Sequence, residues 1–282
     1  MKKQILLLFA GFVLWTWAAS ATEIDFIRCA STSSTQNSGL FNHILPVFEA
    51  KTGIRVHVIA VGTGAALEIG KRGDVDLVFV HAKIDELRMI EEGWFKDRRD
   101  VMYNNFVLVG PASDPAGLKS AHSAGNALKR IFETRSLFIS RGDNSGTHKM
   151  EMRLWAHIGM HPGSGGWYLE SGQGMAKTLR IAANKNAYAL SDKGTFLSLA
   201  DRNSLGLFVL FEGDPLLFNQ YGVMLVNPEK HAHIKSRSAL IFIDWLTSKE
   251  GQETIGTFKD LHGNQLFFPN ALQTNANGII QK

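Results

Sequence analysis

The sequence predicts an α/β protein of two lobes, and three observations support this prediction. Short apolar runs alternate with stretches of helical periodicity, which is typical of helices that cover a parallel sheet. The length of 282 residues exceeds the roughly 250 residues at which single cores stop growing. Two apolar runs end at the breakers Gly110-Pro111 and Asn227-Pro228, and they are placed to connect two lobes as hinge strands.

The segment formed by residues 1–21 has the composition of a cleaved secretory signal peptide. Two lysines precede an apolar run over residues 5–19, and small residues that end at Ala21 form a cleavage site. The run is shorter than the ~20 residues that a spanning helix needs, which favours release over an N-terminal anchor. The single cysteine, Cys29, stands beyond the cleavage point, which argues against a lipid anchor. We therefore expect a periplasmic protein.

The charge of the chain is nearly balanced. The net charge of +4 includes the two lysines of the predicted signal peptide, so the mature chain carries 4 − 2 = +2. Basic residues form no block and are not interleaved with aromatic residues, which argues against a nucleic-acid surface. A single cysteine allows no internal disulfide bond. Any preference for anions must therefore come from a local site.

The first predicted lobe comprises residues 22–106 and 222–282. Its apolar runs and periodic stretches follow one another in βαβαβ order, which implies a parallel sheet with ligands at the carboxyl ends of the strands. We expect strands at 23–29, 54–61 and 75–80, helices at 40–51, 65–72 and 84–92, and a closing amphipathic helix at 237–246.

The second predicted lobe comprises residues 107–221. Its pattern also alternates between strand and helix, so we expect a second mainly parallel sheet flanked by helices. The expected helices are 127–134, 147–158 and 175–184, the strands are 137–140, 167–169 and 187–190, and the hinge strands are 105–109 and 221–226.

A run of hydroxyl side chains from Ser31 to Thr35 follows the first strand and opens a helix. Each hydroxyl can donate a hydrogen bond, and the unpaired amides of a helix N-terminus attract anions. A helix cap needs one such residue, whereas five are present. The run therefore predicts an anion-binding loop.

Two weaker loops also join a strand to a helix. Gly62-Thr63-Gly64 combines a hydroxyl with glycines that let a ligand approach the backbone, although a structural turn explains it nearly as well. The loop from Ser191 to Thr195 offers two hydroxyls as possible ligand contacts, and a plain helix cap is the alternative.

The most specific motif is S140-R-G-D-N-S-G-T-H148, which follows a predicted strand. Arg141 offers a charged fork of donors, Ser145 and Thr147 offer hydroxyls, and Gly146 exposes amides at the helix start. A fully deprotonated oxyanion accepts hydrogen bonds on every oxygen, so a site made of donors suits it. We expect Asp143 to pair with Arg141 or to cap the helix, because an inward carboxylate would repel a dianion.

Together these stretches resemble the tungstate-binding component of ABC transporters, a family of type II periplasmic binding proteins. The resemblance extends along almost the whole mature chain and rests on STSSTQNSGL, VIAVGTGAALEIGKRGDVDLVFVH, RRDVMYNNFVLVGPASDPAG, SRGDNSGTHKMEMRLW, GWYLESGQGMAKTLRIA, ALSDKGTF, EGDPLLFNQYGVMLVNPEKH and FIDWLTSKEGQ. It implies a Venus-flytrap fold that captures tungstate between its lobes and delivers it to a permease in the inner membrane.

The resemblance also implies a set of ligand contacts. They are Thr32, Ser33, Thr63, Gly64, Arg141, Ser145 and Thr147. The chemistry of the loops adds Gly146 to the predicted contacts, and Ser31, Ser191 and Thr195 are possible additions. The family usually carries consecutive threonines in the first loop, and Ser31 and Ser33 replace two of them here. This change enlarges the cavity slightly and leaves the choice between tungstate and molybdate open.

Two other classes of function are considered. A binding protein of the same fold for molybdate, sulfate or phosphate is the first alternative. A secreted hydrolase is the second, because Ser145, His148 and Asp143 lie close in sequence, but no nucleophile-elbow motif is present. His231 and His233 are expected to be solvated.

Glu68, Asp74 and Asp76 are acidic residues that could coordinate a cation, but a capping role explains Asp76. We expect a monomer without catalytic activity, cofactor or bound metal cation.

Overall fold

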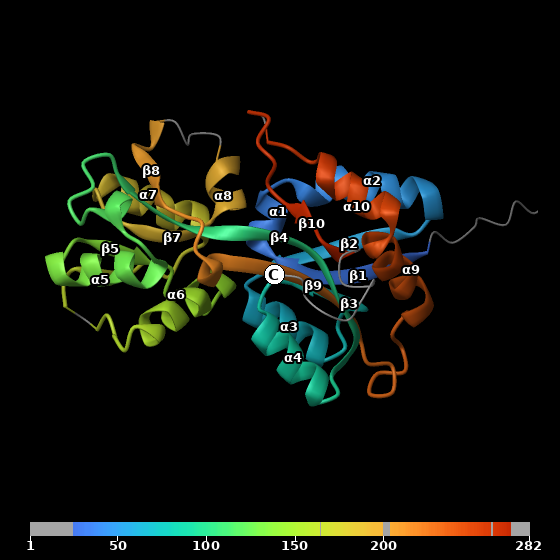
Figure 1. Cartoon of the computed structure of the whole chain (residues 1–282). Coiled ribbons are helices and arrows are strands. Elements are labelled where there is room, and N and C mark those ends of the chain that lie inside the picture. The colour runs from blue at the N-terminus through green and yellow to red at the C-terminus, as the bar shows by residue number, and fades with distance from the viewer. Residues whose placement is uncertain (1–24, 164, 200–203, 261, 272–282) are drawn as a thin grey trace, which may run out of the picture.

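The computed structural model describes residues 25–163, 165–199, 204–260 and 262–271. The predicted signal peptide, residues 1–21, lies outside the described residues. Two lobes are joined by the long strands β4 (Phe95–Pro111) and β9 (Phe218–Val226) (Figure 1). In these ranges the structure contains no helix with the length and apolar character needed to cross a bilayer.

The first lobe is built on a six-stranded sheet in the order β10-β4-β9-β3-β1-β2. Helices α2 and α10 lie above this sheet in Figure 1, and α3 and α4 lie below it. Besides the crossing strands, its elements are β1 (Phe26–Thr32), α1 (Ser33–Asn37), α2 (Leu40–Thr52), β2 (Arg55–Val61), α3 (Thr63–Lys71), β3 (Leu77–Val80), α4 (Lys83–Glu91), α9 (Ser236–Thr247), α10 (Lys249–Thr257) and β10 (Phe268–Pro269).

The register of the first sheet aligns the ends of its parallel strands. Thr32 at the end of β1 pairs with Val61 at the end of β2, and Ser31 pairs with Phe79 of β3. The loops that follow these three strands therefore emerge at the same edge of the sheet, as expected for the carboxyl ends of parallel strands.

The second lobe receives residues 106–111 of β4, which pair with β7 and β8. Strands β5 and β6 pair in parallel beside them, and an isolated bridge joins Phe138 to Tyr188. The elements of this lobe are η1 (Leu118–Ser120), α5 (Ala124–Thr134), β5 (Phe138–Ser140), α6 (Gly146–His157), β6 (Tyr168–Glu170), α7 (Met175–Asn184), β7 (Ala189–Asp192), α8 (Lys193–Ser198), β8 (Leu207–Phe211) and η3 (Pro215–Leu217).

The predicted two-lobed α/β fold is confirmed, and the structure adds antiparallel pairs to the parallel sheets that were expected. Strands β1, β2 and β3 are parallel, but β9 runs antiparallel to both β3 and β4. The reason is topological: β4 leaves the first lobe and β9 returns to it, so two neighbouring strands that cross in opposite directions must pair antiparallel. The resulting sheet is mixed.

Separate hydrophobic cores fill the two lobes. One core contains the buried residues of β1, β3, α2 and α9, and its members from β4 and β9 include Met102 and Tyr221. Two smaller cores fill the second lobe and include Phe106 and Leu217. The lobe limits predicted at 106/107 and 221/222 stay predictions. Along β4 and β9, the buried side chains pass from the core of one lobe to the core of the other within a few residues of these limits.

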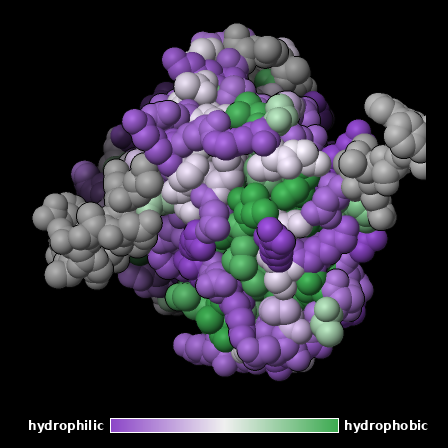
Figure 2. Space-filling model, turned by 90° about the vertical axis from the view of Figure 1, so that its right-hand side faces the viewer, coloured by the Kyte–Doolittle hydropathy of each residue, from purple (hydrophilic) through white to green (hydrophobic). Residues whose placement is uncertain are grey.

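Figure 2 shows the end of the first lobe that lies farthest from the second. Hydrophobic groups gather near its centre and hydrophilic residues surround them. Helices α2 and α9 belong to this end of the molecule, and Val47 and Ile241 on them are each 38% exposed. Apolar side chains with this degree of exposure are ordinary on a protein surface.

Candidate functional site

A small cavity lies where loops of both lobes meet. Its volume is about 10 Å³, on the order of the space that one water needs, whereas pockets for organic molecules measure roughly 300–1,000 Å³. The cavity therefore suits a compact ion. It is lined by Thr32, Ser33, Ser34, Val61, Gly62, Thr63, His81, Arg141, Ser145 and Gly146.

The loop after β1 brings hydroxyls to the cavity. Thr32 caps α1 by accepting a hydrogen bond from the amide of Thr35 at 3.2 Å, and its Oγ1 lies 3.0 Å from Ser34 Oγ. Ser33 lies on the wall beside them. Ser31 does not line the cavity, because its hydroxyl donates to the carbonyl oxygen of Phe79 at 2.6 Å.

The loop after β2 presents the N-terminus of α3. Gly62 is the N-cap and offers no side-chain oxygen, so the first amides of α3 receive no capping bond from it. Thr63 lies on the cavity wall and is buried. Gly64 lies off the wall and faces the second lobe, where a Cβ added to it would stand 3.8 Å from Asn144.

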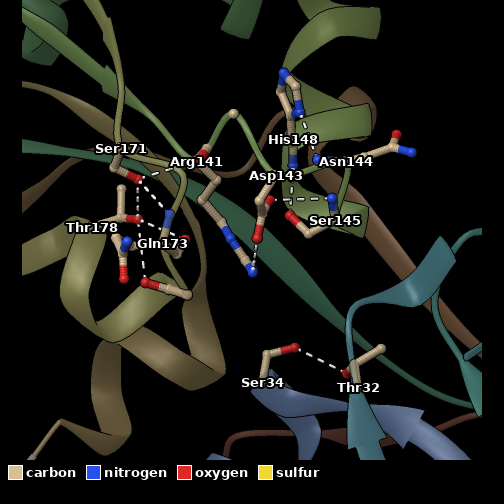
Figure 3. A network of polar contacts seen from close by, with 12 residues as sticks. Thr32, Ser34, Arg141, Asp143, Asn144, Ser145, His148, Ser171, Gln173 and Thr178 are labelled. Atoms are coloured by element: carbon tan, nitrogen blue, oxygen red, sulfur yellow. Dashed lines mark hydrogen bonds and ion pairs between the residues drawn. The ribbon is translucent and has the colours of Figure 1, made fainter. Parts of the chain in front are cut away.

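Arg141 extends from the second lobe toward Thr32 and Ser34 of the first (Figure 3). Its side chain is buried, and its Nε has no hydrogen-bond partner among the described residues. Its guanidinium donates to the carboxylate of Asp143, which also accepts the amide of Ser145 at 3.2 Å. Of the two roles expected of Asp143, the structure shows the pairing with Arg141, whereas Ser145 is the cap of the helix, and Asp143 does not line the cavity.

The start of α6 contributes Ser145 and Gly146 to the wall. Ser145 caps the helix, its Oγ accepting from the amide of His148 at 3.3 Å. Gly146 packs against the first lobe so closely that an added Cβ would lie 3.0 Å from Thr63 Oγ1 and 3.0 Å from His81 Cε1. Thr147 is buried and is not among the residues that line the cavity, and its Oγ1 has no hydrogen-bond partner in the described part of the chain.

The loop after β7 lies away from the cavity. Ser191 donates to the carbonyl oxygen of Asp192 at 2.9 Å, and Asp192 caps α8 by accepting the amide of Thr195 at 2.8 Å. Neither Ser191 nor Thr195 lines the cavity. The geometry fits the helix-cap alternative for this loop.

One lining side chain, His81, was missed from the sequence, and Ser34 was predicted as part of the hydroxyl run but not as a contact. His81 follows β3 directly, and Ser34 lies in the first turn of α1. Their signal was positional, because the end of β3 meets the same sheet edge as the ends of β1 and β2. Burial lowers the pKa of His81, and the positive charges of Arg141 and Arg153 act in the same direction, while Asp192 opposes them.

The wall is rich in donors. It offers the hydroxyls of Thr32, Ser33, Thr63 and Ser145, the guanidinium of Arg141 and the amides at two helix starts. None of the described residues that line the cavity carries a carboxylate. Such a wall favours a small, fully deprotonated anion, because each of its oxygens accepts hydrogen bonds.

The arrangement does not assemble a hydrolytic triad. The contact of His148 to the hydroxyl of Ser145 comes from its backbone amide, and the imidazole Nδ1 accepts the amide of Asn144 at 3.0 Å instead. The carboxylate of Asp143 points to Arg141 rather than to the imidazole. The groups that a hydrolase would need are therefore aimed away from one another.

The two histidines expected to be solvated have structural partners. His231 Nε2 lies 2.9 Å from the carbonyl oxygen of Lys71, the last residue of α3, and His233 Nε2, on an exposed residue, lies 2.8 Å from that of Gly73 in the turn that follows. Asp76 accepts the amides of Arg28 and Lys235. Across the described ranges, no group of three or more His, Cys, Asp or Glu side chains is placed to hold a metal ion.

Comparison with known families first defines the class of the protein. A model of the PBP superfamily domain matches residues 18–250, in agreement with two lobes that enclose a ligand-sized cavity between them. Relatives that match over most of the chain are more specific. The tungstate-binding protein TupA of Peptoclostridium acidaminophilum is 46% identical over 248 residues, which cover 87% of this chain and 86% of that protein. TupA of Campylobacter jejuni is 36% identical, covering 81% and 86%.

Solved structures agree with these relatives. The tungstate-binding protein TupA of Desulfovibrio alaskensis G20 superposes with a TM-score of 0.77 at 43% identity, covering 88% of this chain and 99% of that one. A structure described as the tungstate ABC transporter of Geobacter sulfurreducens gives a TM-score of 0.75 at 46% identity, covering 83% and 98%. The chain belongs to the TupA family within the PBP superfamily.

Proposed function

We propose that the chain is the substrate-binding protein of an ABC importer and captures tungstate in the cavity between its lobes. The observation that carries this proposal is the composition of the wall, which joins hydroxyls, helix amides and Arg141 and contains no carboxylate among its described residues. Both lobes contribute donors, so bound anion holds the lobes together. The names of the relatives from Peptoclostridium acidaminophilum and Campylobacter jejuni support tungstate as the ligand.

Within this proposal, the contacts are Thr32, Ser33, Thr63, Arg141, Ser145 and the amides near Gly146, all on the wall. Gly64 and Thr147 do not line the cavity but belong to the first turns of α3 and α6, next to the contacts. The possible contacts Ser31, Ser191 and Thr195 act in the surrounding structure, because their polar atoms face away from the cavity or lie off its wall.

The proposed setting is the periplasm, where a monomer released from its signal peptide delivers the anion to a permease in the inner membrane. A relative from Haloferax volcanii, 45% identical over 252 residues, is named a putative ABC transporter anion-binding protein, which supports the partnership with a transporter. The proposed role is binding without catalysis, because the hydroxyl of Ser145 and the imidazole of His148 are not aligned for proton transfer.

Calorimetric titration of the purified chain from residue 22 with tungstate, molybdate, sulfate and phosphate tests the proposed function. We expect one tungstate per chain, bound more tightly than sulfate or phosphate, and the same titration measures the margin over molybdate. Replacement of Arg237, an exposed arginine on α9, by alanine is the control for a lost positive charge far from the cavity and should not change the affinity. Tight binding of phosphate without binding of tungstate would overturn the proposal.

A further inference from the structure

A chain of hydrogen bonds leads from the cavity across both crossing strands into the second lobe. Thr32 Oγ1 lies 3.0 Å from Ser34 Oγ, which lies 3.5 Å from His81 Nε2. On the other side of the ring, His81 Nδ1 lies 3.0 Å from Asn219 Oδ1 of β9. The chain continues from Asn219 to Asn104 of β4 at 2.7 Å and from Asn104 to Asp192 at 3.4 Å. All six side chains are buried.

The carboxylate at the far end fixes the direction of every donor in this chain. Asp192 can only accept from Asn104, so the amide of Asn104 points its nitrogen to Asp192 and its oxygen to Asn219. Asn219 therefore donates with its nitrogen and accepts at its oxygen. A flip of either amide would place two acceptors against each other. Consequently Nδ1 of His81 carries a proton and donates to Asn219.

This polarity decides what the hydroxyls in the cavity can do. A neutral imidazole with its proton on Nδ1 has a lone pair on Nε2, so the hydroxyl of Ser34 donates to the ring. Its proton then points away from an anion in the cavity, and its oxygen turns a lone pair toward the anion. When Nε2 is also protonated, the ring donates to Ser34, and the hydroxyl proton of Ser34 becomes free to reach the anion.

We infer that His81 takes up a proton when the anion binds, and that the protonated ring turns the hydroxyl of Ser34 toward the anion. The inference rests on the proposed function, because it concerns the same cavity. The proton comes from solvent and binds Nε2, and no other bond is made or broken. The bound complex gains one positive charge and one donor at the wall.

Charged groups around the ring are consistent with such a switch. Burial lowers the pKa of His81, as do Arg141 from the loop after β5 and Arg153 from α6, while Asp192 of β7 raises it. The free ring is therefore held in its neutral form. A dianion beside Arg141 offsets the effect of that guanidinium and attracts the imidazolium directly, so the pKa of His81 rises on binding.

His81 is a lining residue of two cavities. His81 and Asn219 also border a second cavity of about 400 Å³, whose wall includes Lys83, Arg153 and His157. His81 thus lines both the small cavity and the larger one, and within this inference the proton reaches the ring through the larger cavity while the anion occupies the small one. The aromatic ring of Tyr221 stacks on His81 at 4.6 Å and keeps its plane fixed during the exchange.

Calorimetry of the full mature chain with sodium tungstate tests this inference. Titrations between pH 6 and 9, each in two buffers of different ionisation enthalpy, give the number of protons taken up per anion. We expect close to one proton near neutral pH and an affinity that rises by up to about tenfold for each unit that the pH falls. His81→Gln should bind tungstate with no proton uptake and a flat pH profile, whereas His122→Gln, at an exposed histidine that lines neither cavity, should behave like the wild type.

Several results would overturn the inference. Tight binding of tungstate by the wild type without proton uptake would do so, as would uptake that persists in His81→Gln. A merely structural role for His81 would change affinity but leave the proton number unaltered. If His81→Gln does not fold, the imidazole resonances of the wild type give the answer, since an ionisation of His81 unmoved by tungstate refutes the mechanism. Failure of the wild type to bind tungstate would instead refute the proposed function itself.

Discussion

The replacement Arg141→Ala is the sharpest perturbation of the proposed site. Arg141 is only 8% exposed, lies on the cavity wall, and pairs with the carboxylate of Asp143. Truncating one partner of a buried charge pair costs about 2–5 kcal/mol of binding free energy. At 1.4 kcal/mol for each factor of ten, this range corresponds to a loss of about 30-fold to about 4,000-fold in tungstate affinity.

The structure places the expected loss toward the upper end of that range. Without Arg141, Asp143 keeps the amide of Ser145 but loses its cationic partner, and its charge then repels the dianion. The double variant Arg141→Ala with Asp143→Asn should therefore bind tungstate more tightly than Arg141→Ala alone. Arg141→Lys should recover part of the affinity, because it restores the charge without the fork of donors.

Calorimetric titration at fixed ionic strength measures these affinities, and thermal unfolding without ligand shows whether each variant folds. An Arg141→Ala variant that binds tungstate within threefold of the wild type would refute the placement of Arg141 in the site. Equal affinity of the single and double variants would refute the stated role of Asp143. Full recovery in Arg141→Lys would show that the residue acts as a point charge.

Two further predictions concern the closure of the lobes and the pH dependence of stability. Gly146→Ala places a methyl group 3.0 Å from atoms of the first lobe, so we expect overpacking to destabilise the closed form by about 1–3 kcal/mol. Calorimetry should then show weaker binding of tungstate, while the melting temperature without ligand should change little. Glu151 is buried against Tyr168, and burial raises its pKa from 4.5 to about 7. Its contribution to stability is thus complete below pH 4.5 and is lost as the pH rises through 7. Glu151→Gln should remove that pH dependence, and its free energy of unfolding at pH 9 should exceed that of the wild type by about 3 kcal/mol. Chemical unfolding of the variant at several pH values measures this, and a wild-type dependence of stability on pH would contradict the prediction.

Much of the fold was predictable because the buried strands and their helices are local patterns. The run VDLVFV is apolar except for Asp76, and its last four residues form the fully buried strand β3, which starts two residues later than predicted. By contrast, β4 begins ten residues before the predicted strand 105–109. The prediction missed this first half because its sequence, FKDRRDVMYN, has the polar composition of a loop. Arg98 in that half is buried against Glu86, a pairing that the local sequence does not reveal.

The loops that form the site were also predictable, but the choice of side chains within them was not. Hydroxyl-rich stretches at the ends of β1 and β2 do meet at one edge of the sheet. Successive side chains of a strand point to opposite sides, so Ser31 and Thr32 cannot both face the cavity. The contributions of Ser34 and His81 depend on how α1 and the end of β3 pack against the crossing strands, which only the tertiary structure shows.

The central claim is that donors from both lobes hold one tungstate in the small cavity beside Arg141. A crystal structure of the mature chain grown with tungstate tests it most directly, because the anomalous scattering of tungsten locates the anion without ambiguity. The account predicts a single strong peak enclosed by Thr32, Thr63, Arg141 and Ser145, with the lobes closed over it. A peak in the larger cavity near Arg153, or on the surface alone, would contradict the account.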